Sequence, residues 1–195
     1  MRVPIALASC ALVLAACGGG GSASPSSSSV PASSSAPAAT WAVSDCATLS
    51  PPVEGTPPAG SVVEGAVATT AEVGTAPIVS IDAAATPATT LVTADIVEGT
   101  GDPVAAGATV TVDYCGVGLD SGAIFDSSFA RGQPATFPLD GVIMGWQDGI
   151  PGMKPGGRRV LIIPGDQAYG PNPPPGSGIG PNETLVFVVD MLSSP

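Results

Sequence analysis

Histidine is absent from all 195 residues of the chain. Histidine is the commonest general base near neutral pH and the commonest metal ligand in proteins. A serine or cysteine triad of the ordinary kind is therefore excluded, and we expect neither a metal nor another cofactor. Hydrolase activity is disfavoured on the same ground, although a lysine-based mechanism stays open.

Positive charge is also scarce. The chain has five Lys and Arg against 16 Asp and Glu, a formal net charge of -11 and a pI near 4.1. No Lys or Arg lies between Arg2 and Arg131. Such a surface repels phosphate backbones, which argues against nucleic acid as a partner.

The first 17 residues, "MRVPIALASCALVLAAC", combine one positive charge at Arg2 with an apolar run and small residues. This pattern is typical of an export signal, and the run is shorter than the about 20 residues of a membrane-spanning helix. "LAAC" before Gly18 resembles the lipobox of bacterial lipoproteins, which predicts lipidation of Cys17 and an anchor in the bacterial cell membrane. Ordinary secretion is the alternative, and both interpretations place the mature protein outside the cytoplasm.

The length allows one ordinary domain plus tails. Residues 18–40 are almost entirely Gly, Ser, Ala and Pro, which predicts a disordered tether. Residues 41–75 begin with turn formers and have no sustained period, so we expect a partly ordered lead-in. The globular domain is then expected at 76–195.

Apolar periodicity predicts an α+β fold. Strand candidates with β-branched residues between Gly and Pro turns occur at 61–70, 76–83, 89–99, 109–117, 133–141, 158–165 and 184–192. Val110, Val112 and Tyr114 alternate with polar residues and should face the core. Only 141–150 offers a helix. Short connections favour an antiparallel sheet, so we expect one curved sheet against one short helix.

Two cysteines remain if Cys10 leaves with the signal and Cys17 is lipidated. Cys46 and Cys115 would then share an oxidising compartment, where pairing is expected. A disulfide between them would stabilise the fold by about 4 kcal/mol on the chain-entropy model. The alternative is a buried free thiol at Cys115 and a loose one at Cys46.

Aromatic residues are few, and all but Trp41 lie in the C-terminal part of the chain. Aromatics in strands and one helix are usually core residues, but their order here is informative. The segments "FDSS" with Arg131 after it, "GWQDGIPGMKPGGRR", "IPGDQAYG" and "TLVFVVDML" together resemble the FKBP-type peptidyl-prolyl isomerases, the macrolide-binding immunophilins. The resemblance covers about residues 90–194.

The resemblance implies a curved antiparallel sheet wrapped around the short helix, with an apolar cleft between them. Trp146 would form the floor of the cleft and Ile179 would close it. The implied walls are Tyr114, Phe125, Phe137, Val142, Ile143 and Phe187. Ala135 stands where the family often has another aromatic, which implies a wider cleft on that side.

The resemblance also implies polar roles. Tyr169 would offer its hydroxyl to a substrate carbonyl, and the backbone N–H of Ile143 would bind a second carbonyl. Asp126 would lie at the rim beside Tyr114, held by Arg131. The catalytic set would be Tyr114, Phe125, Asp126, Trp146 and Tyr169.

Simpler interpretations of these residues also stand. Phe137 and Phe187 would then be core residues only, and Asp126 with Arg131 would be an exposed ion pair of at most about 1 kcal/mol. Lys154, Arg158 and Arg159 are expected to form a solvated strand face.

The function that follows from the resemblance is isomerisation of Xaa-Pro bonds in exported proteins, with proline-containing polypeptides and macrolides as partners. Rotation about an amide needs no nucleophile, so the missing histidine is no obstacle. The alternative is a proline-binding or chaperone module with little turnover. A purely structural envelope lipoprotein would need no such cleft.

Overall fold

The computed structural model describes residues 40–194. The predicted export signal, the lipidation site Cys17 and all but the last residue of the 18–40 tether lie outside the described residues. Within the described part of the chain, no helix is long and apolar enough to cross a membrane.

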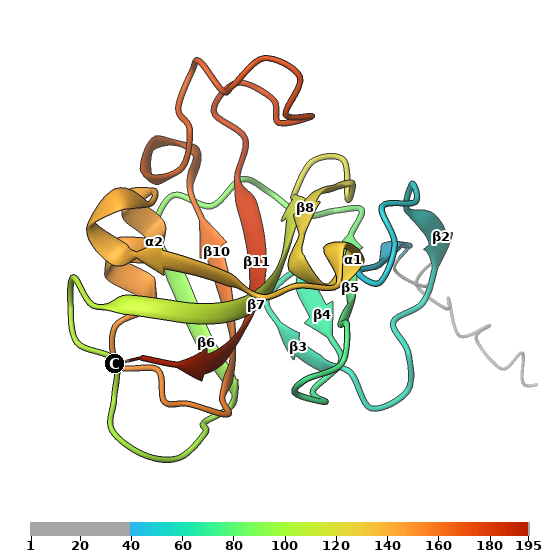
Figure 1. The fold of residues 1–195 in the computed structure, drawn as a ribbon. Helices are drawn as coiled ribbons and strands as arrows, with labels where there is room; N and C mark the ends of the chain where they lie inside the picture. Colours follow the sequence, from blue (N-terminus) through green and yellow to red (C-terminus); the bar gives the residue numbers. More distant parts are fainter. Residues whose placement is uncertain (1–39, 195) are drawn as a thin grey trace, which may run out of the picture. The chain divides into compact units, whose positions relative to one another are not determined.

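A six-stranded antiparallel sheet occupies the C-terminal part of the chain (Figure 1). Its main path runs β6-β10-β11-β7-β8, and β9 pairs with β7. The strands are β6 (Val92–Val97), β7 (Thr109–Gly118), β8 (Ile124–Ser127), β9 (Ala135–Pro138), β10 (Arg158–Ile163) and β11 (Leu185–Ser193). The predicted antiparallel pairing of the sheet is confirmed.

Helix α2 (Met144–Gly149) packs against one face of this sheet (Figure 1). Two glycines on the buried side of the helix permit the close approach. A Cβ atom at Gly145 would overlap Ile163, and one at Gly149 would come within 2.8 Å of Leu161. The helix predicted within 141–150 is present at residues 144–149, and the predicted α+β class is confirmed. Helix α1 (Ser128–Arg131) and two 3-10 turns, Leu139–Gly141 and Gly165–Gln167, complete the helical elements.

Strand β7 alternates as its sequence predicts. Val110, Val112 and Tyr114 are buried in the core beneath α2, with Tyr114 6% exposed. Cys115 and Val117 point to the opposite face and are also fully buried. The strand therefore contributes to two cores, one on each side of the sheet.

The second core exists because residues 41–82 form another antiparallel sheet, of order β2-β1-β5-β4-β3. Its strands are β1 (Trp41–Asp45), β2 (Val53–Gly55), β3 (Val62–Glu64), β4 (Val67–Thr69) and β5 (Ile78–Asp82). Buried residues from both sheets share one cluster, among them Val67, Val79, Ile81, Val117, Leu119, Val160, Ile162, Val186 and Val188. We call residues 41–82 the covering sheet.

The covering sheet differs from the expected organisation. Residues 41–75 supply four of its strands, and β5 pairs with β1 and β4 rather than with the strands around α2. The change from one sheet to the other thus falls between Asp82 and Val92, not near residue 75. Strands β3 and β4 both fall within the strand predicted at 61–70, which a turn divides in two, whereas β2 has three residues among turn formers and shows no period.

Two buried links join the covering sheet to the larger one. Cys46 and Cys115 form a disulfide with a Cα–Cα distance of 5.9 Å. Arg158 is fully buried, and its guanidinium binds Asp190 from β11 and the carbonyl oxygens of Thr70 and Thr75. The expectation that Arg158 lies on a solvated strand face is wrong, because the covering sheet encloses this side of β10.

Candidate active site

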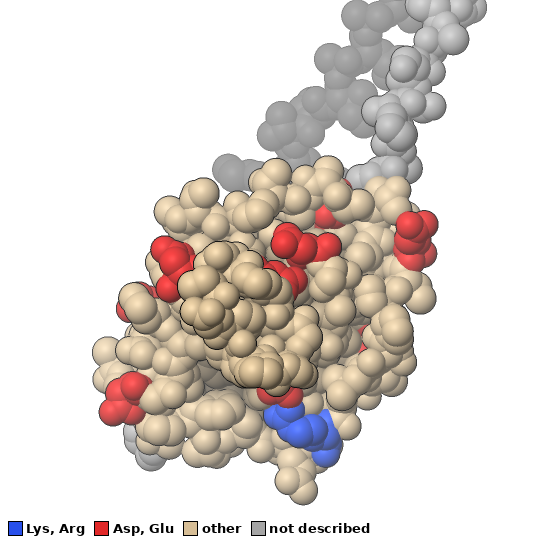
Figure 2. All heavy atoms as spheres, turned by 90° about the horizontal axis from the view of Figure 1, so that it is seen from above, with Lys and Arg blue, Asp and Glu red and all other residues tan. Residues whose placement is uncertain are grey.

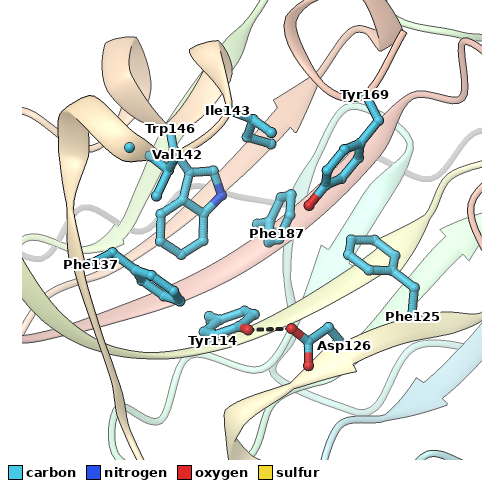
Figure 3. A pocket seen from close by; sticks show the side chains of 10 residues that line it. Tyr114, Phe125, Asp126, Phe137, Val142, Ile143, Trp146, Tyr169 and Phe187 are labelled. Carbon is cyan, nitrogen blue, oxygen red and sulfur yellow. Dashed lines mark hydrogen bonds between the residues drawn. The ribbon is translucent and has the colours of Figure 1, made fainter. Parts of the chain in front are cut away.

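A cavity of about 320 Å³ lies between α2 and the larger sheet. Nine of the residues that the sequence assigns to a site line it, together with Gly141 (Figure 3). The nine are Tyr114, Phe125, Asp126, Phe137, Val142, Ile143, Trp146, Tyr169 and Phe187. They come from β7, β8, β9, α2, β11 and the turns before and after these elements.

Trp146 occupies the centre of an aromatic cluster. Helix α2 places its indole on the sheet, where it is 3% exposed. Its ring meets Tyr114, Phe137 and Phe187 edge to face, with centroids 5.5, 5.8 and 5.3 Å away. Each neighbour fixes the plane of the indole, so one face of a rigid ring is available to a ligand (Figure 3).

The opposite wall contains the polar groups of the cavity. The Tyr114 hydroxyl donates a hydrogen bond to Asp126 Oδ2, and Arg131 Nη1 pairs with Asp126 Oδ1. Arg131 Nη2 donates to the Tyr114 oxygen at 3.1 Å. We call these three residues the polar wall, although the Arg131 side chain lies outside the cavity lining.

Burial, and next the hydrogen bond to Asp126, raise the pKa of Tyr114 to about 12. The hydrogen bond to Tyr114 in turn raises the pKa of Arg131. Tyr114 therefore stays protonated and Arg131 charged across the physiological range. Tyr114 thus remains a hydrogen-bond donor to Asp126, with the Arg131 cation beside them.

Phe125 and Tyr169 line the side of the cavity away from Phe137 (Figure 3). Phe125 meets Phe187 edge to face at 5.4 Å. The Tyr169 side chain is 38% exposed, and its hydroxyl points into the cavity (Figure 3). Burial first, and the negative charge of Asp126 second, raise the pKa of Tyr169, so this hydroxyl remains available as a hydrogen-bond donor.

A glycine that the sequence analysis did not single out shapes this side. A Cβ atom on Gly116 in β7 would lie 2.5 Å from Phe125 Cζ and 3.0 Å from Phe187 Cε1. The missing side chain lets both rings lie against the strand. A glycine inside an alternating strand is the available sequence signal for such a close approach.

Val142 and Ile143 form the cavity edge at the start of α2. The Val142 carbonyl accepts a hydrogen bond from Gln147 Nε2 at 2.8 Å. Among the residues described, the Ile143 N–H finds no backbone or side-chain acceptor, whereas its carbonyl accepts from Trp146 and Gln147. One main-chain donor is thus free at the rim.

Ile179 does not line the cavity. It packs, half-buried, against the core beneath α2 from the loop before β11. That loop is held by Glu183, whose Oε2 accepts a hydrogen bond from the Gly180 N–H at 2.6 Å. Ala135 packs against the same core and likewise lies outside the lining.

The arrangement suits an apolar ring with a carbonyl beside it. Aromatic faces surround the cavity, and the Tyr169 hydroxyl and the Ile143 N–H are hydrogen-bond donors at its edge. Between residues 40 and 194, no three His, Cys, Asp or Glu side chains gather as metal ligands do.

Comparison with known proteins identifies a family for this chain. A family model described as FKBP-type peptidyl-prolyl cis-trans isomerase matches residues 101–192. A probable FK506-binding protein of Corynebacterium glutamicum is 51% identical over 105 residues, 53% of this chain and 86% of that protein. An FK506-binding protein of Streptomyces anulatus is 50% identical over 101 residues, 51% of this chain and 82% of that protein.

Among solved structures, the crystal structure of FkpA from Escherichia coli is similar with a TM-score of 0.51 and 38% identity. The match covers 67% of this chain and 52% of that one. Sequence, cavity and fold thus agree, and the chain belongs to the FKBP-type peptidyl-prolyl cis-trans isomerases.

Proposed function

We propose that this isomerase acts on Xaa-Pro bonds of exported polypeptides and lowers the rotation barrier by holding the twisted amide in the aromatic cavity. The observation that carries the proposal is the Trp146 ring, which lines the cavity and is held in place by three aromatic neighbours. A proline ring would pack on its open face.

The physical basis is the electronic change during rotation. A planar amide is stabilised by resonance, and its rotation barrier is about 18 to 20 kcal/mol. Twisting removes the charge-separated form that water solvates best. A site that excludes water therefore destabilises the planar amide relative to the twisted one, and each 1.36 kcal/mol of difference gives about a tenfold rate increase.

The donors at the cavity edge would orient the peptide. The Tyr169 hydroxyl would bind one carbonyl oxygen and the Ile143 N–H another, so that the prolyl bond lies over Trp146. Asp126, paired with Arg131 and hydrogen-bonded by the Tyr114 hydroxyl, would shape the wall without transferring a proton. Each role uses interactions that are stronger in the twisted state than in the planar one, and such interactions raise kcat rather than ground-state affinity.

Macrolides are the second ligand class that we propose for this cavity. The names of two similar proteins describe them as FK506-binding. A macrolide that occupies the proline site would inhibit the isomerase by competition.

Export and anchoring complete the proposal. The pattern of residues 1–17 supports export with lipidation at Cys17, and residues 18–40 would form a tether of roughly 25 Å. The Cys46–Cys115 disulfide suits an oxidising compartment. The substrates would then be proline-containing chains that fold outside the cytoplasm.

The test is exchange NMR on a short Xaa-Pro peptide with residues 18–195, with and without Trp146→Leu and Tyr169→Phe. We expect the cis-trans exchange rate to fall at least tenfold with Trp146→Leu and severalfold with Tyr169→Phe. Trp41→Leu is the matched control, since Trp41 lies in β1 of the covering sheet, and should change the rate less than twofold. A folded wild-type protein that binds the peptide without accelerating exchange would instead be a proline-binding module.

A further inference from the structure

The end of β1 lies behind the active-site strand. Tyr114 on β7 faces the cavity, and Cys115, the next residue, faces the covering sheet. The Ser44 hydroxyl donates to the carbonyl of Gly122, in the turn between β7 and β8, at 2.6 Å. The covering sheet is thus joined to the strands of the site at more than one point.

Cys46 makes the closest connection. Its sulfur is bonded to Cys115, and its carbonyl accepts a hydrogen bond from the Ser127 hydroxyl at 2.7 Å. Its own N–H donates to the carbonyl of Pro77 at 3.1 Å, which ties it to the rest of the covering sheet. All three residues in contact across this junction, Cys46, Cys115 and Ser127, are at most 1% exposed.

The register of the strands places this junction directly behind the polar wall. Cys115 of β7 and Ser127 of β8 lie opposite each other in the sheet. Tyr114 and Asp126 each precede one of these residues and point to the other face, where their side chains are hydrogen-bonded. Cys46 is therefore bonded to both strands, in each case at the residue that follows a cavity-lining member of the polar wall. These two members are Tyr114 and Asp126.

Ser127 extends the connection to the third member. Its hydroxyl caps helix α1 by accepting a hydrogen bond from the Ala130 N–H at 3.2 Å. Helix α1 ends at Arg131, which binds Asp126 and Tyr114. One hydroxyl thus serves both the helix that carries Arg131 and the junction with Cys46.

We infer that Cys46 and Ser127 are positioning residues of the active site, and that through them the covering sheet fixes the Tyr114, Asp126 and Arg131 side of the cavity. The inference rests on the proposed roles of the cavity residues in isomerisation. Neither residue contacts the cavity itself. They would act by fixing the positions of the polar-wall side chains and by limiting the motion of those side chains.

The test compares Ser127→Ala with Val67→Ala in the full exported chain. Val67 is a buried residue of β4 in the same intersheet core, so its truncation weakens the intersheet packing without touching the junction. The first measurement is kcat and KM for an Xaa-Pro peptide at a temperature where both variants are folded. The second is the NMR signals of the Tyr114 ring, which are simple to assign because Tyr169 is the other tyrosine of the chain.

We expect Ser127→Ala to lower kcat/KM three- to tenfold and to shift or broaden the Tyr114 ring signals. Val67→Ala should lower the melting temperature but leave both measurements unchanged within twofold. The double variant Cys46→Ala, Cys115→Ala should act like Ser127→Ala, and it provides the test if Ser127→Ala does not fold. Equal effects of Ser127→Ala and Val67→Ala, or unmoved Tyr114 signals in a folded Ser127→Ala or double variant, would overturn the inference.

The two proposals fail in different ways. If the wild-type protein does not accelerate exchange, the proposed function fails, while the Tyr114 ring signals still report whether the junction positions the wall. If the wild type is active and the junction variants retain full activity with an undisturbed ring, only the positioning role fails.

Discussion

Every nitrogen of the Arg158 guanidinium has an acceptor in the interior of the protein. Nε and Nη2 donate to Asp190 at 2.5 and 2.8 Å. Nη1 donates to the Thr70 carbonyl at 2.8 Å, and Nη2 also donates to the Thr75 carbonyl at 2.7 Å. Asp190 Oδ2 accepts a further bond from the Gly74 N–H at 2.7 Å. The stability of the folded protein therefore depends on both partners of this buried pair, because removal of either one leaves the other charge unpaired in the interior.

We therefore predict that Asp190→Ala lowers the free energy of unfolding by about 3 to 5 kcal/mol, because it leaves a buried, unpaired guanidinium. Glu98→Ala removes an exposed partner of Lys154 and should cost less than about 1 kcal/mol. Urea unfolding of both variants measures the difference. A loss below about 1 kcal/mol for Asp190→Ala would mean that water or another carboxylate replaces the pair.

Residue-level prediction from sequence succeeded where a position depends on its own strand or motif. The alternation over 109–117 places Tyr114 correctly in the core, and nine of the residues assigned by resemblance to the FKBP-type isomerases line one cavity. Arg158 was misplaced because its burial depends on a sheet formed by residues 41–82. Gly116 was missed although a glycine inside an alternating strand signals a close approach, and the structure adds that Phe125 and Phe187 are the rings that approach it.

At the scale of elements, α2 depends on two glycines for its contact with β10. Gly145→Ala would place a Cβ atom inside the volume of Ile163 and move the helix away from the sheet. We predict a loss of stability of about 1 to 3 kcal/mol, the usual cost of overpacking. Because Trp146 is the next residue, kcat/KM should also fall.

Asp148→Ala is the control for this helix, since Asp148 lies on its exposed side. Thermal unfolding and peptide exchange on both variants separate a general effect on the helix from displacement of Trp146. Unchanged kcat/KM in a destabilised Gly145→Ala protein would show that the helix moves without carrying the indole out of place.

The long strands were predicted from the sequence and the short strands β1 and β2 were not, for a physical reason. Strands β7, β10 and β11 have six to ten residues and clear apolar patterns. Strands β1 and β2 lie among Pro, Ser and Gly, and β2 is exposed throughout, so burial leaves no pattern in its sequence. Among the described residues, β2 pairs only with β1, and β1 is held in the sheet by β5, which is distant along the chain.

At the scale of the whole molecule, the charge is predominantly negative. The described part of the chain contains all 16 Asp and Glu, and four of these pair with Arg131, Lys154, Arg158 and Arg159. Twelve carboxylates are left without a basic partner among residues 40–194. Figure 2 shows carboxylates spread over one face, with a single basic cluster near its edge.

This excess of negative charge predicts a preference for basic substrates. An Xaa-Pro peptide flanked by lysines should show a severalfold higher kcat/KM at low ionic strength than the same peptide flanked by glutamates, with a serine-flanked peptide between them. The difference should shrink above about 0.3 M salt, because the Debye length falls below the distance between peptide charges and the surface. A preference that persists in high salt would indicate direct contacts instead.

Strands β10 and β11 and most of β7 are buried on both faces, and this sets the smallest piece of the protein that can stand alone. A fragment cut before β6 would expose the outer side of its sheet, where Val117, Val160, Ile162, Val186 and Val188 are now buried. A contiguous apolar patch of this kind promotes association. Transplanting the isomerase into another protein would therefore require either residues 41–82 as well or polar replacements across that face.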